Sequence, residues 1–143
     1  MAYVRGPDGS QVSAPSQLEL TWPVDRSLCT ERGGAHLLST PNLVLLMERT
    51  AVQLVEPLLG PNETTVGTEI RVSHRAPTPE GSTVRVRATI VGREGRFISL
   101  QLEAFDEVDQ IGVAEHKRAV VDTERYAARL ASKLQQLREV EGS

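Results

Sequence analysis

The sequence lacks the residues from which several familiar kinds of site are built. Among its 143 residues there is one cysteine, Cys29, so neither an internal disulfide bond nor a Cys₄-type zinc site can form. The three histidines, His36, His74 and His116, have no neighbours at metal-ligand spacing, and Walker-type glycine loops and Gly-x-Ser-x-Gly elbows are absent. We therefore expect no metal and no cofactor.

Positive charge, aromatic residues and long apolar runs are also scarce. Sixteen Lys and Arg against nineteen Asp and Glu give a net charge of −3, which does not indicate a nucleic-acid or anionic-membrane partner. Two Phe, two Tyr and one Trp are too few for base-stacking platforms. No apolar run approaches the ~20 residues of a membrane span, and no signal-peptide core is present. A single-domain, cytoplasmic protein is the expectation.

One stretch, residues 40–56, organises the rest of the chain because it predicts a long buried helix. Ser39 or Thr40 can cap its first turn, and Pro41 suits a first-turn position where no N–H is needed. Pro57 ends it. The segment is apolar almost all round, which is typical of a helix covered on most sides.

Glu48 is the exception within this helix. A carboxylate among apolar side chains must be paired, hydrogen-bonded or directed into a site. The sequence leaves two interpretations open: a catalytic carboxylate, or a structural ion pair with Arg71 or Arg118.

Five segments show the period-2 alternation of strands, and they predict one antiparallel sheet. In residues 65–74 the alternation places Val66, Thr68, Ile70, Val72 and His74 on one face. The segments are residues 17–24, 65–74, 82–91, 97–106 and 111–121. A curved antiparallel sheet of about five strands, wrapped around a long buried helix and followed by a C-terminal helix, is an α+β hot-dog fold.

The remaining segments set the domain boundaries. Residues 1–16 predict a flexible arm, and residues 17–143 predict a single domain. Residues 25–39 have no regular pattern, so they predict an irregular loop that is either a lid or a plain connection. Residues 123–140 predict a final amphipathic helix that packs on the sheet or on a partner.

Two further polar residues are candidates for chemistry. His74 ends its strand on the apolar face, where an imidazole can transfer protons near neutral pH, although a structural histidine is the simpler interpretation. Thr40 stands at the start of the helix, where capping alone explains it. The free amides of a helix N-terminus favour a developing oxyanion, and Asn42 and Leu43 would supply them because Pro41 has no N–H.

Taken together, these motifs resemble the fluoroacetyl-coenzyme A thioesterase family of hot-dog proteins. The resemblance covers residues 36–125. It is carried by Thr40, by Leu-Met-Glu at 46–48, by Gly-Thr at 67–68, by Val-Ser-His at 72–74 and by His-Lys-Arg-Ala-Val at 116–120.

The resemblance implies an acyl-CoA thioesterase with Thr40, Glu48 and His74 as its catalytic set. Glu48, or a water that it activates, would attack the thioester carbonyl, Thr40 would assist, and His74 would transfer protons to the departing thiolate. Gly67 and Arg118 match positions beside the substrate. The resemblance further implies a homodimer with sites between subunits and no metal.

The chain departs from the family pattern at one position. The fluoroacetyl-specific enzyme has a phenylalanine in its lid, six residues before the threonine, and the matching residue here is Gly34. We therefore expect a small acyl group without fluoroacetyl specificity. Two alternatives stay open: a non-catalytic hot-dog module that binds acyl thioesters, and a hydratase or dehydratase, against which the histidine-free helix counts.

Overall fold

The computed structural model describes residues 4–5, 11–12 and 16–142 of the chain. Within the predicted N-terminal arm, two short strands pair antiparallel: β1 (Val4–Arg5) and β2 (Gln11–Val12). The other residues up to 15 lie outside the described ranges, so the flexibility of the arm stays a prediction. In the described part of the chain, no helix combines the length and the apolarity needed to cross a membrane.

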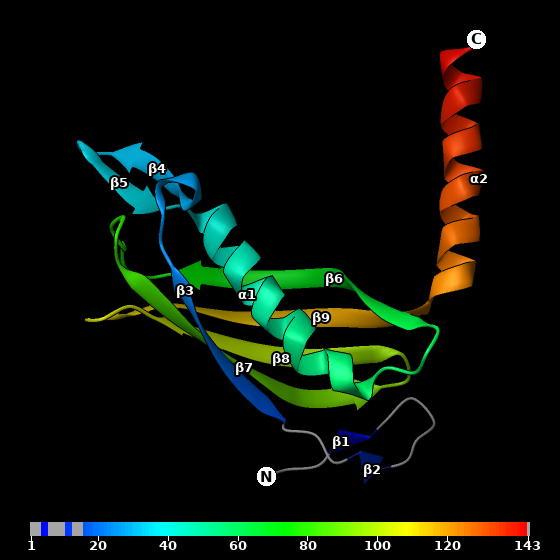
Figure 1. Cartoon of the computed structure of the whole chain (residues 1–143), viewed down its shortest axis with the longest axis horizontal. Coiled ribbons are helices and arrows are strands. Elements are labelled where there is room, and N and C mark those ends of the chain that lie inside the picture. The colour runs from blue at the N-terminus through cyan, green and yellow to red at the C-terminus, as the bar shows by residue number, and fades with distance from the viewer. Residues whose placement is uncertain (1–3, 6–10, 13–15, 143) are drawn as a thin grey trace.

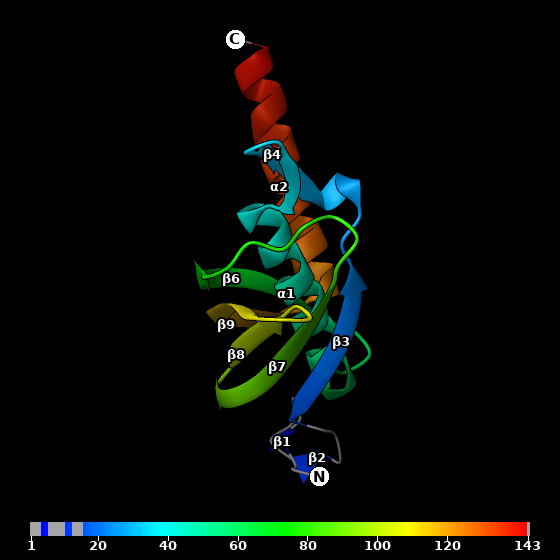
Figure 2. The ribbon, with the colours of Figure 1, turned by 90° about the vertical axis from the view of Figure 1, so that its left-hand side faces the viewer.

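Five strands form one antiparallel sheet in the order β3–β7–β8–β9–β6. They are β3 (Gln17–Pro23), β6 (Glu63–His74), β7 (Thr83–Glu94), β8 (Phe97–Phe105) and β9 (Gln110–Asp122). The sheet curves around one long helix (Figures 1 and 2). The five predicted strands and the hot-dog arrangement are therefore confirmed, with small shifts at the strand ends.

The long helix α1 (Thr40–Val55) crosses the concave face of the sheet and is followed by a short 3-10 helix, η2 (Glu56–Leu58). Its N-cap is Ser39, whose hydroxyl accepts a hydrogen bond from the N–H of Asn42 at 3.3 Å. Across the core, the indole N–H of Trp22 on β3 donates to the buried hydroxyl of Thr50 at 3.0 Å. The side chains that α1 buries are Leu43, Leu46, Met47, Thr50, Ala51, Leu54 and Val55.

The long helix is confirmed, but one side of α1 is not covered within the single chain. Val44, Leu45 and Glu48 are half-buried, and Val52 is 39% exposed. These residues recur every three or four positions, so they share one face of the helix. The sheet of one chain reaches only the opposite face.

Residues 25–39 are ordered, and the prediction of an irregular loop is wrong. They form a 3-10 helix, η1 (Arg26–Leu28), and a hairpin of β4 (Cys29–Arg32) and β5 (Ala35–Leu38). Its two-residue turn is Gly33-Gly34, with φ of 59° and 78°, the left-handed values that this kind of tight turn requires. The hairpin lies beyond the N-terminal end of α1 (Figure 1).

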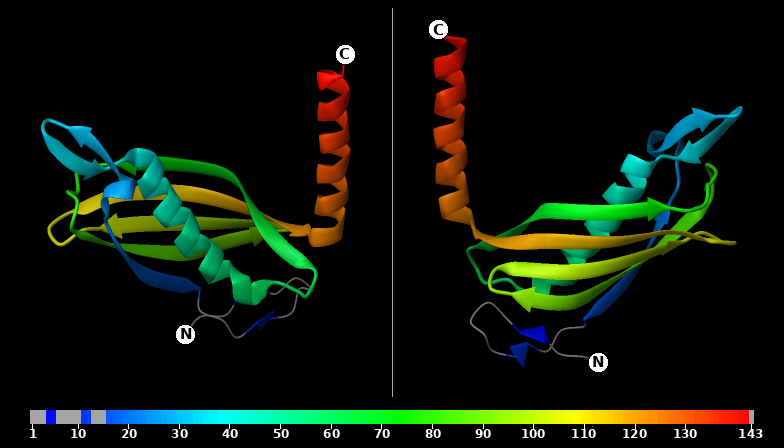
Figure 3. Two further views of the ribbon diagram at one scale, coloured as in Figure 1. Left: turned by 45° about the horizontal axis from the view of Figure 1, so that its top comes forward. Right: turned by 180° about the vertical axis from the view of Figure 1, so that it is seen from behind.

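The terminal helix α2 (Thr123–Glu141) stands away from the sheet (Figures 1 and 3). None of the side chains of this helix, which is described over its whole length, is buried. Its exposed apolar residues are Tyr126, Leu130, Leu134, Leu137 and Val140. The predicted helix is confirmed, but it does not pack on the sheet. Packing on a partner, the other predicted alternative, stays a prediction.

A β-bulge in β6 corrects one predicted face. The register with β9 shifts between Gly67 and Glu69, which makes Thr68 the extra residue. An extra residue reverses which side chains face inward on one side of the bulge. Thr65 and Gly67 therefore face the helix, in place of the predicted Val66 and Thr68.

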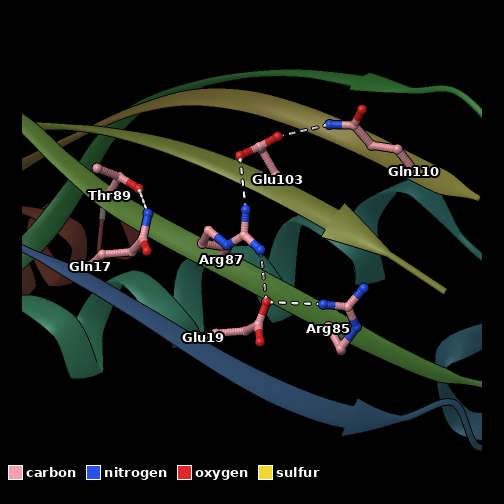
Figure 4. A network of polar contacts seen from close by, with 7 residues as sticks. All are labelled: Gln17, Glu19, Arg85, Arg87, Thr89, Glu103 and Gln110. Carbon is pink, nitrogen blue, oxygen red and sulfur yellow. Dashed lines mark hydrogen bonds and ion pairs between the residues drawn. The ribbon is translucent and has the colours of Figure 1, made fainter. Parts of the chain in front are cut away.

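The outer face of the sheet carries charged side chains that pair with one another across strands (Figure 4). Glu19 on β3 lies 3.1 Å from Arg85 and 3.4 Å from Arg87, both on β7. Arg87 also lies 3.8 Å from Glu103 on β8. This face is a solvated surface whose charges are already matched.

The charged residues 115–118 on β9 alternate between the inner and the outer face of the sheet. His116 and Arg118 point inward and are buried, at 5% and 4% exposure. The outward pair form ion pairs with β6, namely Arg71–Glu115 and Lys117–Glu69. The unusual charge of this strand therefore divides into a surface pair and an inward pair.

Candidate active site

Thr40 and His74 meet where α1 begins and β6 ends. Oγ1 of Thr40 lies 2.8 Å from Nδ1 of His74, a hydrogen bond whose donor depends on the imidazole tautomer. Since Ser39 caps the helix, the hydroxyl of Thr40 is available for this contact. Nε2 of His74 is buried and has no hydrogen-bond partner within the described residues. A buried nitrogen without a partner is available to a substrate or to an attacking group.

The environment of His74 favours its neutral form. Burial lowers the pKa of the imidazole below its ordinary value, and the backbone of Ala76 opposes this with a smaller effect. A neutral imidazole can accept a proton at neutral pH, as a general base must.

A cavity of about 590 Å³ lies beside this pair. Its walls come from the β4–β5 hairpin, from the first residues of α1 and from the residues that follow β6. Its lining includes Thr30, Arg32, Leu37, Thr40, His74 and Arg75. The volume is within the usual range for small-molecule sites.

The amides predicted to hold an oxyanion are engaged within the first turn of α1. The N–H of Asn42 donates to the Ser39 hydroxyl at 3.3 Å, and the N–H of Leu43 donates to the Ser39 carbonyl at 2.9 Å. Substrate binding by Asn42 and Leu43 stays a prediction.

Glu48 belongs to a second cluster, on the inward face of β9 and β6. Nη1 of Arg118 donates to Oε2 of Glu48 at 3.1 Å. The same guanidinium donates through Nε to the Thr65 hydroxyl at 2.9 Å and through Nη2 to the Thr65 carbonyl at 3.1 Å. The Arg118 side chain is 5% exposed and that of Glu48 is 42% exposed, so the carboxylate lies at the open side of a buried cation. Of the two predicted ion-pair partners, Arg118 is the one observed.

His116 completes this cluster in a single tautomer. Its Nδ1–H donates to the carbonyl of Glu69 at 2.8 Å, because a carbonyl oxygen can only accept. Its Nε2 therefore accepts from Nη1 of Arg118 at 3.2 Å. Burial lowers the pKa of His116, and the charge of Arg118 lowers it further. Both effects keep the ring neutral and able to accept this bond.

A side chain at position 67 would displace the Glu48 carboxylate from its observed position. A Cβ at this position would overlap Oε2 of Glu48 and lie 3.2 Å from Nη1 of Arg118. The β-bulge turns this glycine toward the helix. Gly67 and Arg118 thus contact Glu48 directly, whereas their predicted contact with substrate stays a prediction.

The two clusters are separate within one chain. Thr40 and Glu48 are eight positions apart on the unbroken helix α1, which places their Cα atoms about 12 Å apart. The structure therefore brings Thr40 together with His74, and Glu48 together with Arg118 and Gly67, without joining the two groups.

Gly34, the position matching the aromatic lid residue, is at the exposed tip of the hairpin. A Cβ there would have no neighbour within 4 Å in the described structure. Prediction from the sequence missed Thr65 and His116 in the Glu48 cluster and Arg32 and Arg75 beside the cavity. The alternation of residues 115–118 was the signal for His116.

Comparison with known proteins identifies a shared family. A family model described as fluoroacetyl-CoA-specific thioesterase matches residues 24–124. A fluoroacetyl-CoA thioesterase from Streptantibioticus cattleyicolor is 42% identical over 95 residues, which is 66% of this chain and 68% of that protein.

Solved structures agree with this match. The fluoroacetyl-CoA thioesterase FlK has a TM-score of 0.78 and 32% identity, covering 85% of this chain and 97% of its own. A thioesterase superfamily member from Thermus thermophilus has a TM-score of 0.79, covering 89% of this chain and 96% of its own. At 23% identity, this second likeness shows the fold alone.

Proposed function

Because the chain belongs to the fluoroacetyl-CoA-specific thioesterase family, we propose that it hydrolyses a short acyl-CoA thioester to the acid and free coenzyme A. The observation that supports this most is the 2.8 Å contact of Thr40 with His74 beside a ligand-sized cavity. A thioesterase also needs a nucleophile or a base, and Glu48 is the carboxylate held in place for that role.

We further propose a homodimer in which Glu48 of one subunit faces Thr40 and His74 of the other. Three observations support this arrangement. The continuous helix keeps Glu48 away from Thr40 within a chain. The face of α1 around Glu48 is half-uncovered and otherwise apolar. β6 is an edge strand, with a free side for pairing.

Two nucleophiles fit the chemistry. In the first route, a water gives its proton to Glu48, attacks the thioester carbonyl, and the C–S bond breaks as the tetrahedral intermediate collapses. In the second, the Glu48 carboxylate attacks, the thiolate leaves, and water then attacks the Glu48 carbonyl of the mixed anhydride, which releases the acid and restores the carboxylate. A single turnover in ¹⁸O-labelled water followed by mass spectrometry separates them, since only the second route puts the label into Glu48.

The Thr40–His74 pair has a supporting role in either route. In the first route, the proton that Glu48 takes from water passes to the neutral imidazole, which gives it to the departing thiolate as the C–S bond breaks. In the second route, the imidazole takes a proton from the water that opens the anhydride and gives it to the thiolate. The hydroxyl of Thr40 is held by the ring at 2.8 Å and can donate to the carbonyl oxygen or to the attacking group. Gly67 leaves room for the Glu48 carboxylate, and Arg118 orients that carboxylate through its hydrogen bond. Together they hold it ready for the reaction.

We propose a small acyl group without preference for fluoroacetyl. Among the described residues, the cavity lining contains no Phe, Tyr or Trp, and the hairpin presents Gly34 where the family pattern has phenylalanine. An aliphatic and polar wall has little means of distinguishing a C–F from a C–H bond. A sharp preference for fluoroacetyl-CoA over acetyl-CoA would contradict this proposal.

Thiol release from a panel of acyl-CoA esters tests the function. Acetyl, fluoroacetyl, propionyl, butyryl and longer esters are compared with wild type, Glu48→Gln and His74→Ala. We expect kcat to fall at least ~100-fold in each variant, in line with loss of a general acid or base, with circular dichroism unchanged. Glu56→Gln, at the exposed end of α1, is the matched carboxylate control. Full activity of Glu48→Gln would overturn the assignment.

Three features stay predictions at this stage: a reaction without metal or cofactor, the absence of nucleic-acid and membrane partners, and a cytoplasmic location. Dialysis against a chelator before the thiol-release assay tests the first, and unchanged kcat is the expected result.

A further inference from the structure

The cavity beside Thr40 and His74 is lined by positive charge. Among the described residues, its lining contains two arginines, Arg32 and Arg75, and neither Asp nor Glu. The chain as a whole has a net charge of −3. A concave wall whose charge is opposite to that of the chain attracts anions toward the cavity.

Arg32 is held at the wall by its own hairpin. Side chains alternate along β4, so Thr30 and Arg32 line the cavity while Glu31 points away, with its carboxylate 4.0 Å from Nε2 of His36. Nη1 of Arg32 donates to the Thr30 hydroxyl at 3.1 Å and to the Glu31 carbonyl at 2.7 Å. Its Nε and Nη2 make no bond to the residues described, so a planar pair of donors remains for a ligand.

Arg75 also lines the cavity, and it directly follows His74 in the sequence. Its backbone N–H donates to the carbonyl of Ile111 at 2.7 Å, and this bond fixes the position of the Arg75 backbone. Its guanidinium is exposed and forms neither an ion pair nor a hydrogen bond within the described ranges. The arginines on the outer sheet, such as Arg71 and Arg85, are paired with carboxylates. The unpaired cation at the cavity is therefore a departure from the pattern of the sheet.

The N-terminus of α1 adds to this field. Thr40 and Pro41, in its first turn, line the same cavity. A helix of sixteen residues carries about half a positive charge at this end. Three independent groups, from β4, from the end of β6 and from α1, thus present positive charge to one space.

We propose that Arg32 and Arg75 bind the phosphate groups of the thiol carrier, so that the site takes thioesters of phosphorylated pantetheine, coenzyme A foremost. The proposal rests on the function proposed above for the same cavity. A guanidinium matches two phosphate oxygens with two parallel N–H donors, which makes arginine suited to this task. Coenzyme A has a diphosphate and a ribose phosphate, whereas a carrier-protein prosthetic group has a single phosphodiester.

The test adds phosphates to the substrate one step at a time. One acyl group is presented on pantetheine, phosphopantetheine, dephospho-coenzyme A and coenzyme A, and KM is measured for each. With wild type we expect KM to fall along the series and to rise with salt for the phosphorylated carriers. In the double variant Arg32→Gln/Arg75→Gln, we expect KM for acyl-CoA to rise about tenfold per arginine. We also expect the KM values for the four carriers to become nearly equal. Arg125→Gln/Arg129→Gln on α2 removes the same charge far from the cavity and is expected to behave as wild type.

A KM for wild type that is the same on all four carriers would overturn the proposal, as would a double variant with the wild-type series. If KM falls only between pantetheine and phosphopantetheine, the arginines recognise the phosphate that coenzyme A shares with carrier proteins. If KM continues to fall through dephospho-coenzyme A to coenzyme A, they recognise coenzyme A itself.

Calorimetry with free coenzyme A keeps this result separate from catalysis. Weaker binding by the double variant than by wild type supports the phosphate site even if no ester is hydrolysed, in which case the catalytic proposal alone fails. Equal binding by both proteins, together with normal hydrolysis, would overturn the phosphate site alone.

Discussion

Thr40 and Glu48 lie on one unbroken helix, and eight residues of helical rise hold their Cα atoms about 12 Å apart. Each has its own partners: His74 at 2.8 Å from Thr40, and Arg118 at 3.1 Å from Glu48. One chain therefore contains both halves of the proposed site without assembling them. A second copy, placed on the half-uncovered face of α1, can supply the missing half to each.

Replacing Gly67 by alanine is expected to damage catalysis more than stability. The added Cβ would overlap Oε2 of Glu48 and force the carboxylate away from Arg118. A displacement of about 1 Å at a catalytic group can cost about 100-fold in rate, and we expect kcat to fall 10- to 100-fold. The thiol-release assay measures it.

Gly92→Ala is the matched control, since a Cβ at this strand glycine has no neighbour within 4 Å in the described structure. Wild-type kcat in Gly67→Ala would show that the packing of this glycine against Glu48 is irrelevant to turnover.

His116 is expected to keep Arg118 in place only while its ring is neutral. His116→Gln retains an acceptor oxygen near the position of Nε2, whereas His116→Leu removes it and leaves Nη1 of Arg118 without that partner. We expect the glutamine variant to retain several-fold more activity than the leucine variant, because a buried charge that loses a hydrogen bond is costly. Equal kcat values in the two variants would contradict this role.

The same residue gives a pH dependence of stability. The pKa values of His116 and His74 are lowered in the folded chain, chiefly by burial, so below the ordinary histidine value of about 6.5 the unfolded chain binds protons that the folded chain does not. The contribution of these two histidines to the free energy of unfolding is therefore fully present above that pH and is lost as the pH falls. Urea unfolding between pH 8 and pH 5 should show this decrease, with a smaller slope for His116→Gln. An unchanged slope would refute the contribution of His116.

Removal of residues 127–143 is expected to leave the domain folded. None of the side chains along the whole of α2 is buried, while the capping contact of Thr123 with the carbonyl of Asn62 is retained. We expect Tm to change by only a few degrees, as for surface changes in general. Differential scanning calorimetry measures this, and size-exclusion chromatography shows whether the oligomer changes. A large drop in Tm would show that the apolar stripe of α2 packs on another chain.

The sequence was sufficient for the features that depend on local pattern. Alternation located Ile98, Leu100 and Leu102 in the core, and all three are buried to 1% or less. The hairpin of residues 29–38 was missed, although two glycines between short strand-like runs are typical of such turns.

The features that prediction missed depend on contacts between distant residues. The bulge at Thr68 has no local signature, because it arises from the register of β6 on β9. That shift alone turns Gly67 and Thr65 toward Glu48 and Arg118. The ion pair of Glu48 with Arg118 joins residues 70 positions apart. The sequence offered Arg71 and Arg118 as partners, and only the register of the strands selects Arg118.

The most direct test of the shared site is complementation between two inactive variants. His74→Ala and Glu48→Gln are purified separately, unfolded, mixed and refolded together. If each site combines His74 of one subunit with Glu48 of the other, half of the dimers are hybrids with one intact site, and about a quarter of the wild-type kcat should return. If both residues act within one chain, every site in the mixture has a defect. A mixture as inactive as its two parents would contradict the account.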